Sequence, residues 1–357
     1  MGKDFMAKFH KLEGAVKERR NIHSTVIATK SPSLNFTFGN GWGLPLGYSV
    51  ALAGMPKSGK SLILRAMIAQ MHADYPDGIA VVYNTEQREE AQLSPQKAKQ
   101  WGIDLDRYFA YETNHPKLVF DAIWGPIQAL IQEGANIKLI AIDSITGIQG
   151  RRGVDNESIM DQTIGDLAMT IQEGLKKVLE VQRKHKIGLI LTTQVRAEMD
   201  KWEIMRGNKV KMAGSFGLQH HCEYFMLVDK DKTKEGRIDL LGNEFKNEEL
   251  TDSNDDAEKT GHKIKITMKD SSLGPIGRTG VFTLDYNKGI VNVHEEIFTL
   301  GVNRGIIQRP NNRSYEVNGK SWSSKESVIQ GIKDDVDIQA YILKELKAMD
   351  YKNMVCE

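Results

Sequence analysis

The chain has 357 residues, of which 40% are hydrophobic and 27% are charged, a composition typical of a globular protein with one large core and small appendages. The formal net charge is only +1, so a nucleic-acid partner would have to be engaged by local basic patches. No apolar run approaches the roughly 20 residues of a membrane helix, and Cys222 and Cys356 provide no disulfide framework, so we expect a cytoplasmic protein with no membrane partner.

Residues 1–33 are predicted to form an N-terminal helix–strand arm outside the main domain. Apolar side chains from Phe5 to Val16 lie at helical spacing, and Ser24–Lys30 is typical of a short strand. A lone helix and strand have little to pack against. We therefore expect the arm either to dock on another copy of the chain or to fold back on its own core, and the sequence leaves both alternatives open.

The most informative segment is Gly54–Ser61, which fits the pattern G-x-x-x-x-G-K-[ST] between a predicted strand at 48–53 and a predicted helix at 62–71. A strand, a glycine-bounded loop and a helix N-terminus direct several backbone N–H groups and a helix dipole at one point. This context favours a site for a nucleoside triphosphate such as ATP over a chance glycine-lysine turn. In such a site Lys60 contacts the β- and γ-phosphates and Ser61 is a ligand of Mg²⁺. The other residues predicted to bind the nucleotide here are Gly54, Met55, Pro56, Lys57, Ser58, Gly59 and Leu62.

Residues 34–294 are predicted to form an α/β core with a mostly parallel sheet flanked by helices. Near-continuous apolar strands alternate with helical patterns, which implies a parallel sheet covered on both faces. Two later segments, 263–269 and 280–285, alternate in polarity and predict an added antiparallel part. Phosphate sites in such folds lie at the carboxyl ends of the parallel strands. The predicted strands are 79–84, 138–143, 187–193 and 224–229, and the predicted helices are 94–101, 118–133 and 161–185.

Three polar residues follow predicted strands at this edge. Asp143 ends an apolar strand, where an acid in a P-loop protein holds Mg²⁺ through water; the alternative is an aspartate that caps the next turn. Glu86 lies just past another strand and is predicted to be the base that activates the attacking water, in preference to Glu89 or Glu90. Gln194 is predicted to sense the γ-phosphate, although its strand position alone also allows it to satisfy a local backbone group.

Two basic segments, 147–158 and 195–214, leave the ends of these strands without a strong secondary-structure pattern. Positive charge gives salt-dependent contact with phosphates, and interleaved apolar or aromatic side chains can slot between bases. The alternative is a pair of ordinary solvated loops, but structureless loops of about 20 residues are uncommon in compact domains and usually functional. The residues predicted to bind DNA are Arg151, Arg152, Arg196, Trp202, Arg206, Lys209 and Lys211.

Residues 295–357 are predicted to form a small C-terminal α/β lobe. Helical patterns flank a turn rich in glycine, proline and asparagine at 305–312, and the last helix is expected at 338–349. The stretch 243–260 contains seven acidic residues and few apolar ones, so we expect a surface loop there and assign it no role.

The order of these motifs resembles the RecA family of strand-exchange recombinases, most closely its phage UvsX-like branch. The resemblance covers about residues 34–322 and rests on GMPKSGKS, VVYNTEQ, QKAKQWGIDLDRY, KLIAIDS, LTTQVR, AGSFG, KIKITMKDSSLGP and the FTLGVNRGII…GKSW tail. It implies a DNA-dependent ATPase that forms helical filaments on single-stranded DNA and pairs that strand with homologous duplex DNA. Single-strand-binding and loader proteins are further implied partners.

The resemblance also implies roles for single residues. It supports the roles given above to the nucleotide-binding residues. It makes 150–158 the first DNA loop and 196–214 the second, which adds Gly214 to the DNA contacts. RecA presents two lysines to the ATP of a neighbouring subunit; here only Lys269 matches, and Ser271 stands at the second position. Members of the UvsX-like branch carry histidine where this chain has Gln194.

Two other functions remain open from the sequence. A hexameric RecA-fold helicase would need a cross-subunit arginine finger and a closed ring, and the N-terminal arm and the paired basic loops argue against it. A recombination mediator would bind ATP only as a structural ligand and would not need Glu86 as a base.

Overall fold

The computed structural model describes residues 25–39, 41–86, 93–150, 165–197, 210–212, 217–231, 237–238, 260–311 and 314–355. The predicted helix before residue 25, the acidic stretch up to residue 259 and most of both basic segments lie outside these residues. None of the described helices is both long and apolar enough to cross a membrane.

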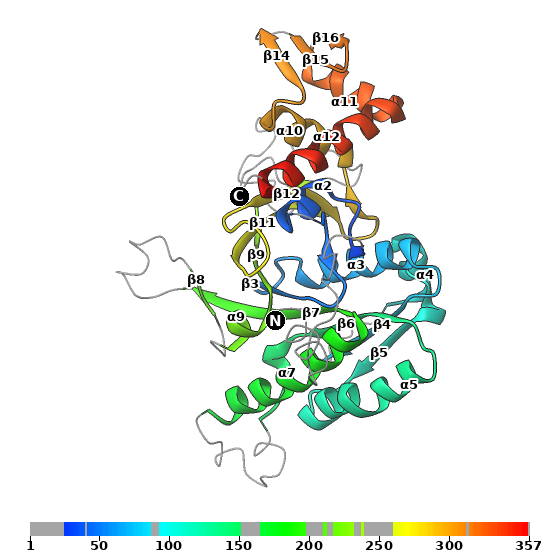
Figure 1. The fold of residues 1–357 in the computed structure, drawn as a ribbon, viewed down its shortest axis with the longest axis vertical. Coiled ribbons are helices and arrows are strands. Elements are labelled where there is room, and N and C mark those ends of the chain that lie inside the picture. Colours follow the sequence, from blue (N-terminus) through cyan, green and yellow to red (C-terminus); the bar gives the residue numbers. More distant parts are fainter. Residues whose placement is uncertain are drawn as a thin grey trace, which may run out of the picture.

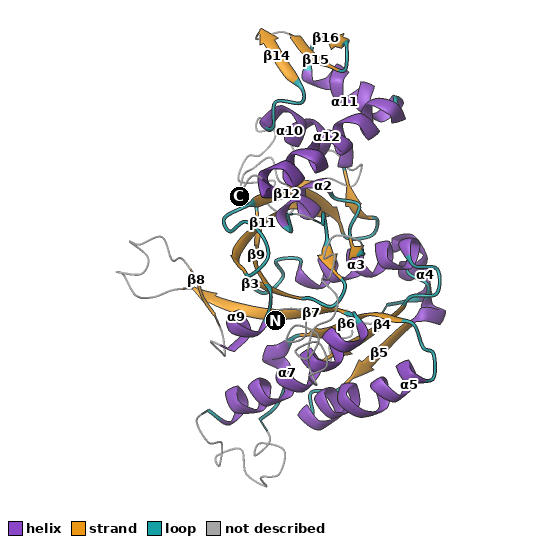
Figure 2. Cartoon of the chain, viewed as in Figure 1, coloured by secondary structure: helices purple, strands orange, loops and turns teal. Residues whose placement is uncertain are grey.

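A large mixed sheet organises the core (Figures 1 and 2). Along its main path the strands follow the order β13-β12-β11-β9-β3-β7-β6-β4-β5, with β10 paired to β11 and β8 paired to β7. Neighbouring strands are parallel from β9 through to β5, whereas β8 and β10–β13 pair antiparallel. The predicted α/β core with an added antiparallel part is therefore confirmed. The parallel strands are β3 (Ser49–Gly54), β4 (Ile79–Asn84), β5 (Tyr108–Glu112), β6 (Ile137–Asp143), β7 (Gly188–Ala197) and β9 (Tyr224–Lys230), and the others are β8 (Val210–Met212), β10 (Arg237–Ile238), β11 (Gly261–Ser271), β12 (Thr279–Asp285) and β13 (Gly289–Val291).

Apolar residues of the inner strands alternate between the two faces of the sheet. Val50 and Leu52 of β3 join the apolar cluster that also contains residues of α3 and α4, whereas Ala51 and Ala53 join the cluster that contains residues of α7. Figure 1 accordingly shows α3 and α4 on one side of β4 and β6, with α5 and α7 on the other. Both faces are covered, which explains why these strands are near-continuous apolar runs. The helices on the two faces are α3 (Lys60–Asp74), α4 (Pro95–Trp101), α5 (Gln128–Gln132) and α7 (Asp166–His185), and a short helix, α9 (Gly217–His221), packs near α7.

The predicted helix 118–133 is present but irregular. Two π-helical turns, η3 (Lys117–Asp121) and η4 (Ile123–Ile127), precede the α-helical end at α5. Pro126 lies inside η4 and has no N–H group to donate to the preceding turn. The proline therefore accounts for the interrupted α-helical ladder.

The described end of the N-terminal arm packs on the chain's own core. β1 (Val26–Ile27) pairs with β2 (Leu44–Pro45), and Ile27 is fully buried. The Ser31 side chain then caps α2 (Pro32–Thr37) by accepting a hydrogen bond from the Leu34 N–H group. Residues 25–33 thus fold back on the chain's own core, which is one of the two alternatives left open by the sequence. Helix α2 crosses residue 33, where the sequence predicted the boundary between the arm and the core.

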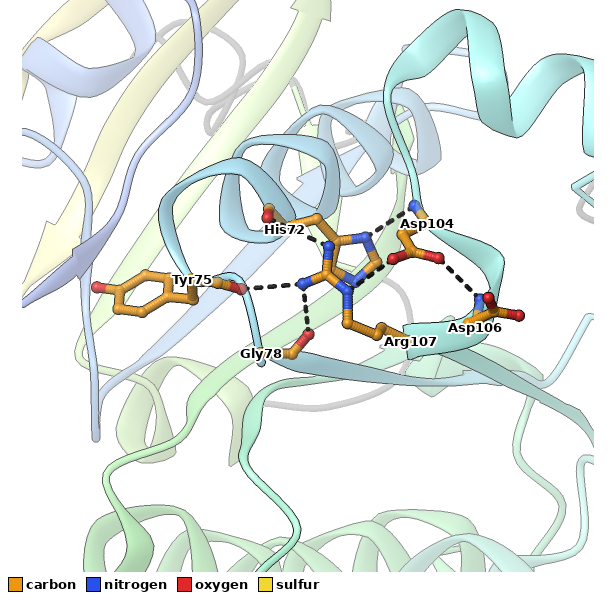
Figure 3. Close-up of polar contacts among 6 residues, drawn as sticks. All are labelled: His72, Tyr75, Gly78, Asp104, Asp106 and Arg107. Atoms are coloured by element: carbon orange, nitrogen blue, oxygen red, sulfur yellow. Dashed lines mark hydrogen bonds and ion pairs between the residues drawn. The ribbon is translucent and has the colours of Figure 1, made fainter.

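Polar contacts fix the chain where α3 ends and β4 begins (Figure 3). Arg107 Nη1 donates to the carbonyl oxygens of Tyr75 and Gly78 at 2.9 and 3.3 Å, and its Nη2 donates to that of His72 at 3.3 Å. Asp104 accepts a further hydrogen bond from Arg107 Nε at 2.8 Å. One guanidinium therefore satisfies carbonyl groups at the end of the helix and ties the short helix η2 (Leu105–Arg107) to it.

A separate apolar cluster supports the C-terminal lobe. Ile297, Val328 and Ile342 are fully buried and come from three different helices, and Phe36 and Trp42 extend the cluster into the core. Figure 1 places a small three-stranded sheet at the tip of the lobe. The elements are α10 (Val293–Asn303), β14 (Gln308–Asn311), β15 (Ser314–Val317), β16 (Lys320–Trp322), α11 (Lys325–Asp334) and α12 (Val336–Val355).

Glu296 joins this lobe to α2 through a buried carboxyl group. Its Oε2 accepts hydrogen bonds from Ser31 Oγ at 2.5 Å and from the Ser33 N–H group at 3.0 Å, and the residue is 6% exposed. Burial raises the pKa of Glu296 from 4.5 to about 8 against the opposing effect of these hydrogen bonds. At a pH between these two values, the Glu296 carboxyl group is therefore protonated in the folded chain and ionised in the unfolded chain.

This carboxyl group predicts a pH dependence of stability. Because the folded pKa of Glu296 is raised, its contribution is fully present below the unfolded value and is lost as the pH rises towards about 8. Between pH 6 and pH 8 we expect it to lower the free energy of unfolding by about 2 kcal/mol. Urea unfolding of the wild type and of Glu296→Gln measures this; equal pH slopes in the two proteins would contradict it.

Candidate functional site

The glycine-rich loop connects β3 directly to α3. Gly59 precedes Lys60 with a φ of 101°, and a Cβ atom on it would meet Ile264 Cδ1 at 2.5 Å. A Cβ atom on Gly54 would meet the Val228 carbonyl oxygen at 2.5 Å. Gly59 is therefore required both by its backbone conformation and by the neighbouring strand β11, and Gly54 by the close approach of β9.

Lys60 is folded over this loop. Its Nζ donates to the carbonyl oxygens of Gly54 and Met55, both at 3.0 Å, and the residue is only 8% exposed. The positive charge therefore lies inside the loop, at the N-terminus of α3, where the helix dipole and the backbone N–H groups also favour an anion.

The loop forms one wall of a cavity of about 510 Å³ at the carboxyl ends of the parallel strands. The sequence predicted most of its lining, but Gly54 and Met55 are not among the lining residues. Lys269 is exposed on β11, seven residues beyond the lining residue His262, and does not reach this cavity within one chain. The predicted residues that line the cavity are Pro56, Lys57, Ser58, Gly59, Lys60, Ser61, Leu62, Glu86, Asp143 and Gln194.

The acids and the glutamine meet where three neighbouring strands end: Glu86 follows β4, Asp143 ends β6 and Gln194 lies near the end of β7. Glu86 Oε1 accepts hydrogen bonds from Ser144 Oγ and from Gln194 Nε2, each at 2.7 Å. Asp143 Oδ1 accepts one from Thr192 Oγ1 at 2.5 Å. Gln194 thus contacts the predicted base itself and not merely a local backbone group.

The donor set fits Mg²⁺. The Ser61 hydroxyl and the Asp143 carboxylate line the same cavity and offer hard oxygen ligands. The described residues contain no cluster of three or more His, Cys, Asp or Glu side chains suited to a metal. Mg²⁺ commonly uses one or two protein oxygens with phosphate oxygens and water, so a larger cluster is not required.

The second basic segment, 195–214, was predicted to lack secondary structure, but both of its ends contain strand residues. β7 continues to Ala197 and β8 returns antiparallel to it, with Arg196 opposite Lys211. The Arg196 side chain is exposed, and for Lys211 the structure describes only the backbone. The prediction was wrong because the many lysines and arginines of this segment are not typical of a strand. The sequence therefore did not indicate that β7 continues beyond Gln194 and pairs with β8. Arg151, Arg152, Trp202, Arg206, Lys209 and Gly214 lie outside the described residues.

Ser271, which stands at the second of the two lysine positions implied by the family resemblance, has a local structural role. Its Oγ accepts hydrogen bonds from the N–H groups of Leu273 and Gly274 at 3.1 and 2.8 Å. The side chain therefore stabilises the turn between β11 and β12.

The sequence analysis missed part of the cavity wall. Strand order, rather than spacing along the chain, brings Lys230 of β9, His262 of β11 and Tyr286 after β12 beside the glycine-rich loop. Arg65 and Lys97 instead lie on α3 and α4, to which the sequence analysis assigned no site residue beyond Leu62. The missed lining residues are Arg65, Asn84, Lys97, Lys230, His262 and Tyr286.

This phosphate loop, with acids on neighbouring strands of a mostly parallel sheet, defines a P-loop ATPase core. Residues 8–291 match the RecA N-terminal domain family, and the chain belongs to that family. Protein RecA of Thermotoga maritima is 24% identical over 328 residues, which cover 90% of this chain and 82% of that protein. Protein RecA of Mycoplasma genitalium is 25% identical over 340 residues, covering 94% and 88%. The chain is a RecA-type recombinase and a DNA-dependent ATPase.

Proposed function

We propose that the chain polymerises with ATP and Mg²⁺ as a helical filament on single-stranded DNA and pairs this strand with homologous duplex DNA. The observation that supports this most directly is the hydrogen bond between Gln194 and Glu86. This hydrogen bond connects Glu86, the predicted base of ATP hydrolysis, to strand β7. Arg196, at the start of the second basic segment, lies on the same strand as Gln194.

Each residue of the cavity has a role in this proposal. Lys60 and the loop N–H groups hold the phosphates, and Ser61 and Asp143 hold Mg²⁺, which would neutralise negative charge as the γ-phosphate leaves. Glu86 orients a water molecule and accepts its proton. Thr192 and Ser144 fix the two carboxylates through the hydrogen bonds described above.

Gln194 couples the nucleotide to DNA. A γ-phosphate in the cavity competes with Glu86 for the Gln194 amide, and movement of this side chain shifts the end of β7. The hairpin formed with β8 then changes its position, and with it the basic segment that contacts DNA. ATP shifts this equilibrium only as far as it binds the two arrangements differently.

Finer parts of the assignment rest on the family resemblance. We propose membership of the UvsX-like branch, a location in the cytoplasm of a bacterial or phage-infected cell, and help from single-strand-binding and loader proteins. Lys269 would face the ATP of a neighbouring copy; its side chain is exposed and is not among the residues that line the cavity of its own chain. Residues 1–24 would contact another copy, and residues 295–357 would form a small lobe packed on the core of their own chain.

Nucleotide-dependent DNA binding tests this function. We expect the wild type to bind a labelled oligonucleotide at least about tenfold more tightly with a non-hydrolysable ATP analogue, and Lys60→Ala to lose this increase because the analogue no longer binds. Electron microscopy of the same samples should show helical filaments. Closed rings, or equal binding by a monomer without nucleotide, would contradict the proposal.

A further inference from the structure

A short chain of hydroxyl groups leads from the predicted base Glu86 to the connector that follows β6. Ser144 Oγ donates to Glu86 Oε1 at 2.7 Å, and Thr146 Oγ1 lies 2.8 Å from the same Ser144 oxygen. Thr146 belongs to η5 (Ile145–Gly147), a 3-10 turn directly after Ser144. It is not among the residues that line the nucleotide cavity, so its link to the base is the Ser144 hydroxyl.

The number of protons fixes the direction of this chain. Each hydroxyl group has one proton to donate and can accept through its lone pairs. An ionised carboxylate accepts hydrogen bonds but donates none, so the Ser144 proton is committed to Glu86. Thr146 must then donate to Ser144, and the chain runs from Thr146 through Ser144 to Glu86.

The backbone around Ser144 is held in place relative to Glu86. Thr85, the residue before Glu86, donates through Oγ1 to the Ser144 carbonyl oxygen at 2.5 Å and accepts from the Ser144 N–H group at 3.0 Å. A Cβ atom on Gly147 would clash with Thr85 Oγ1, so η5 packs closely against the same residue. Ile145 is 1% exposed and anchors η5 in the apolar core. The connector that carries the hydroxyl chain is therefore fixed relative to the base.

Hydrogen bonds in series strengthen one another. A hydroxyl group that accepts a hydrogen bond becomes a better donor, by roughly 10–30% per bond. Donation by Thr146 therefore strengthens the hydrogen bond from Ser144 to Glu86, and that bond favours the ionised carboxylate. Thr146 thus keeps Glu86 ionised to a lower pH than Ser144 alone would allow.

We propose that Thr146 is a positioning residue for ATP hydrolysis, which orients the Ser144 hydroxyl towards Glu86 and helps to keep this base ionised. The inference rests on the proposed function, in which Glu86 accepts the proton of the attacking water. The turn that carries Thr146 leads into the first basic segment, whereas Gln194 lies on the strand that leads into the second. The base is therefore hydrogen-bonded towards both connectors.

The pH dependence of single-turnover ATP hydrolysis on single-stranded DNA tests this role. We expect Thr146→Val, which keeps the shape of the side chain and removes the hydroxyl, to move the midpoint of the acid limb up by about half a pH unit. The sign follows from the weaker hydrogen bond, because the Glu86 carboxylate then takes up its proton at a higher pH. Thr146→Ser keeps the hydroxyl, so its midpoint should stay within about 0.2 pH units of the wild type. ATP binding should stay within about twofold in both variants.

A double-mutant cycle shows whether Thr146 acts through Ser144. Ser144→Ala should raise the same midpoint by about one pH unit, and Thr146→Val should add less than about 0.2 units in that background. Equal shifts in the two backgrounds, or a Thr146→Val midpoint equal to that of the wild type, would overturn the inference. Thermal unfolding checks the fold of each variant; if the valine variant does not fold, Thr146→Ala replaces it, with the same outcomes.

Other charged and titratable groups of the cavity are the same in all these variants. They include Lys60 and Arg65 of α3, Lys97 of α4, Asp143 of β6, Lys230 of β9 and His262 of β11. An acid limb that belongs to one of these groups would not depend on Thr146. Turnover unchanged by Glu86→Gln would remove the proposed base itself, whereas loss of turnover in Glu86→Gln with an unshifted limb in Thr146→Val would overturn this inference alone.

Discussion

Replacing Glu86 with glutamine is expected to lower ATP turnover on single-stranded DNA by at least about a hundredfold, because an amide cannot accept the proton of the attacking water. ATP binding should change little. The amide oxygen of glutamine can still accept the hydrogen bonds that Ser144 and Gln194 donate to Glu86 Oε1, so the local structure is preserved. Single-turnover hydrolysis, with nucleotide binding measured separately, distinguishes loss of the base from loss of the site.

Glu133→Gln provides a matched control for this variant. Glu133 is exposed at the C-terminal end of α5 and is not among the residues that line the nucleotide cavity. We expect its turnover to stay within about threefold of the wild type, as a residue outside the reacting centre should. Turnover by Glu86→Gln at the rate of this control would show that another group acts as the base.

Asp350→Asn is expected to lower the free energy of unfolding by about 3 kcal/mol, because it leaves a largely buried arginine without its counter-charge. Arg278 Nη1 and Nη2 donate to the two carboxylate oxygens of Asp350 at 3.0 and 2.9 Å, and Trp42 Nε1 donates to the same carboxylate at 3.0 Å. The Asp350 side chain is 2% exposed and that of Arg278 15%. Chemical denaturation followed by tryptophan fluorescence measures the loss.

An exposed ion pair serves as the comparison. Lys177 and Asp121 approach to 3.1 Å, but their side chains are 44% and 48% exposed. Asp121→Asn should therefore cost less than about 1 kcal/mol. Equal losses of unfolding free energy in the two variants would mean that the buried Asp350 network stabilises the fold no more than a surface ion pair, which would contradict the prediction.

The sequence was sufficient to predict elements whose pattern is local. The strand at 79–84 and the phosphate loop follow from short apolar runs, a glycine pattern and a helix start, and the structure has them at these residues. β5 was missed although its aromatic residues Tyr108, Phe109 and Tyr111 favour a strand, because the segment is short and lacks the long apolar run of the inner strands. It lies at the edge of the sheet, where residues 109–112 are exposed. The hairpin of β7 and β8 was missed because charged residues dominate its composition.

The residues of the candidate site also fall into a group that the sequence predicted and a group that it did not. Lys60, Glu86 and Asp143 could be predicted because each follows a strand in a fixed order along the chain. His262 and Lys230 could not, because they reach the cavity only through the pairing of β11 with β9 and of β9 with β3. The pairing of these strands depends on the arrangement of the whole sheet and cannot be predicted from the spacing of residues along the chain.

The two hydrogen bonds to one oxygen of Glu86 have a consequence for its basicity. Ser144 and Gln194 both donate to Oε1, and each of these hydrogen bonds stabilises the carboxylate and makes it a weaker base. In the proposed mechanism, a Gln194 amide that turns from Glu86 to the γ-phosphate would strengthen the base at the moment when ATP is bound. One amide would then link the arrival of the nucleotide to its hydrolysis.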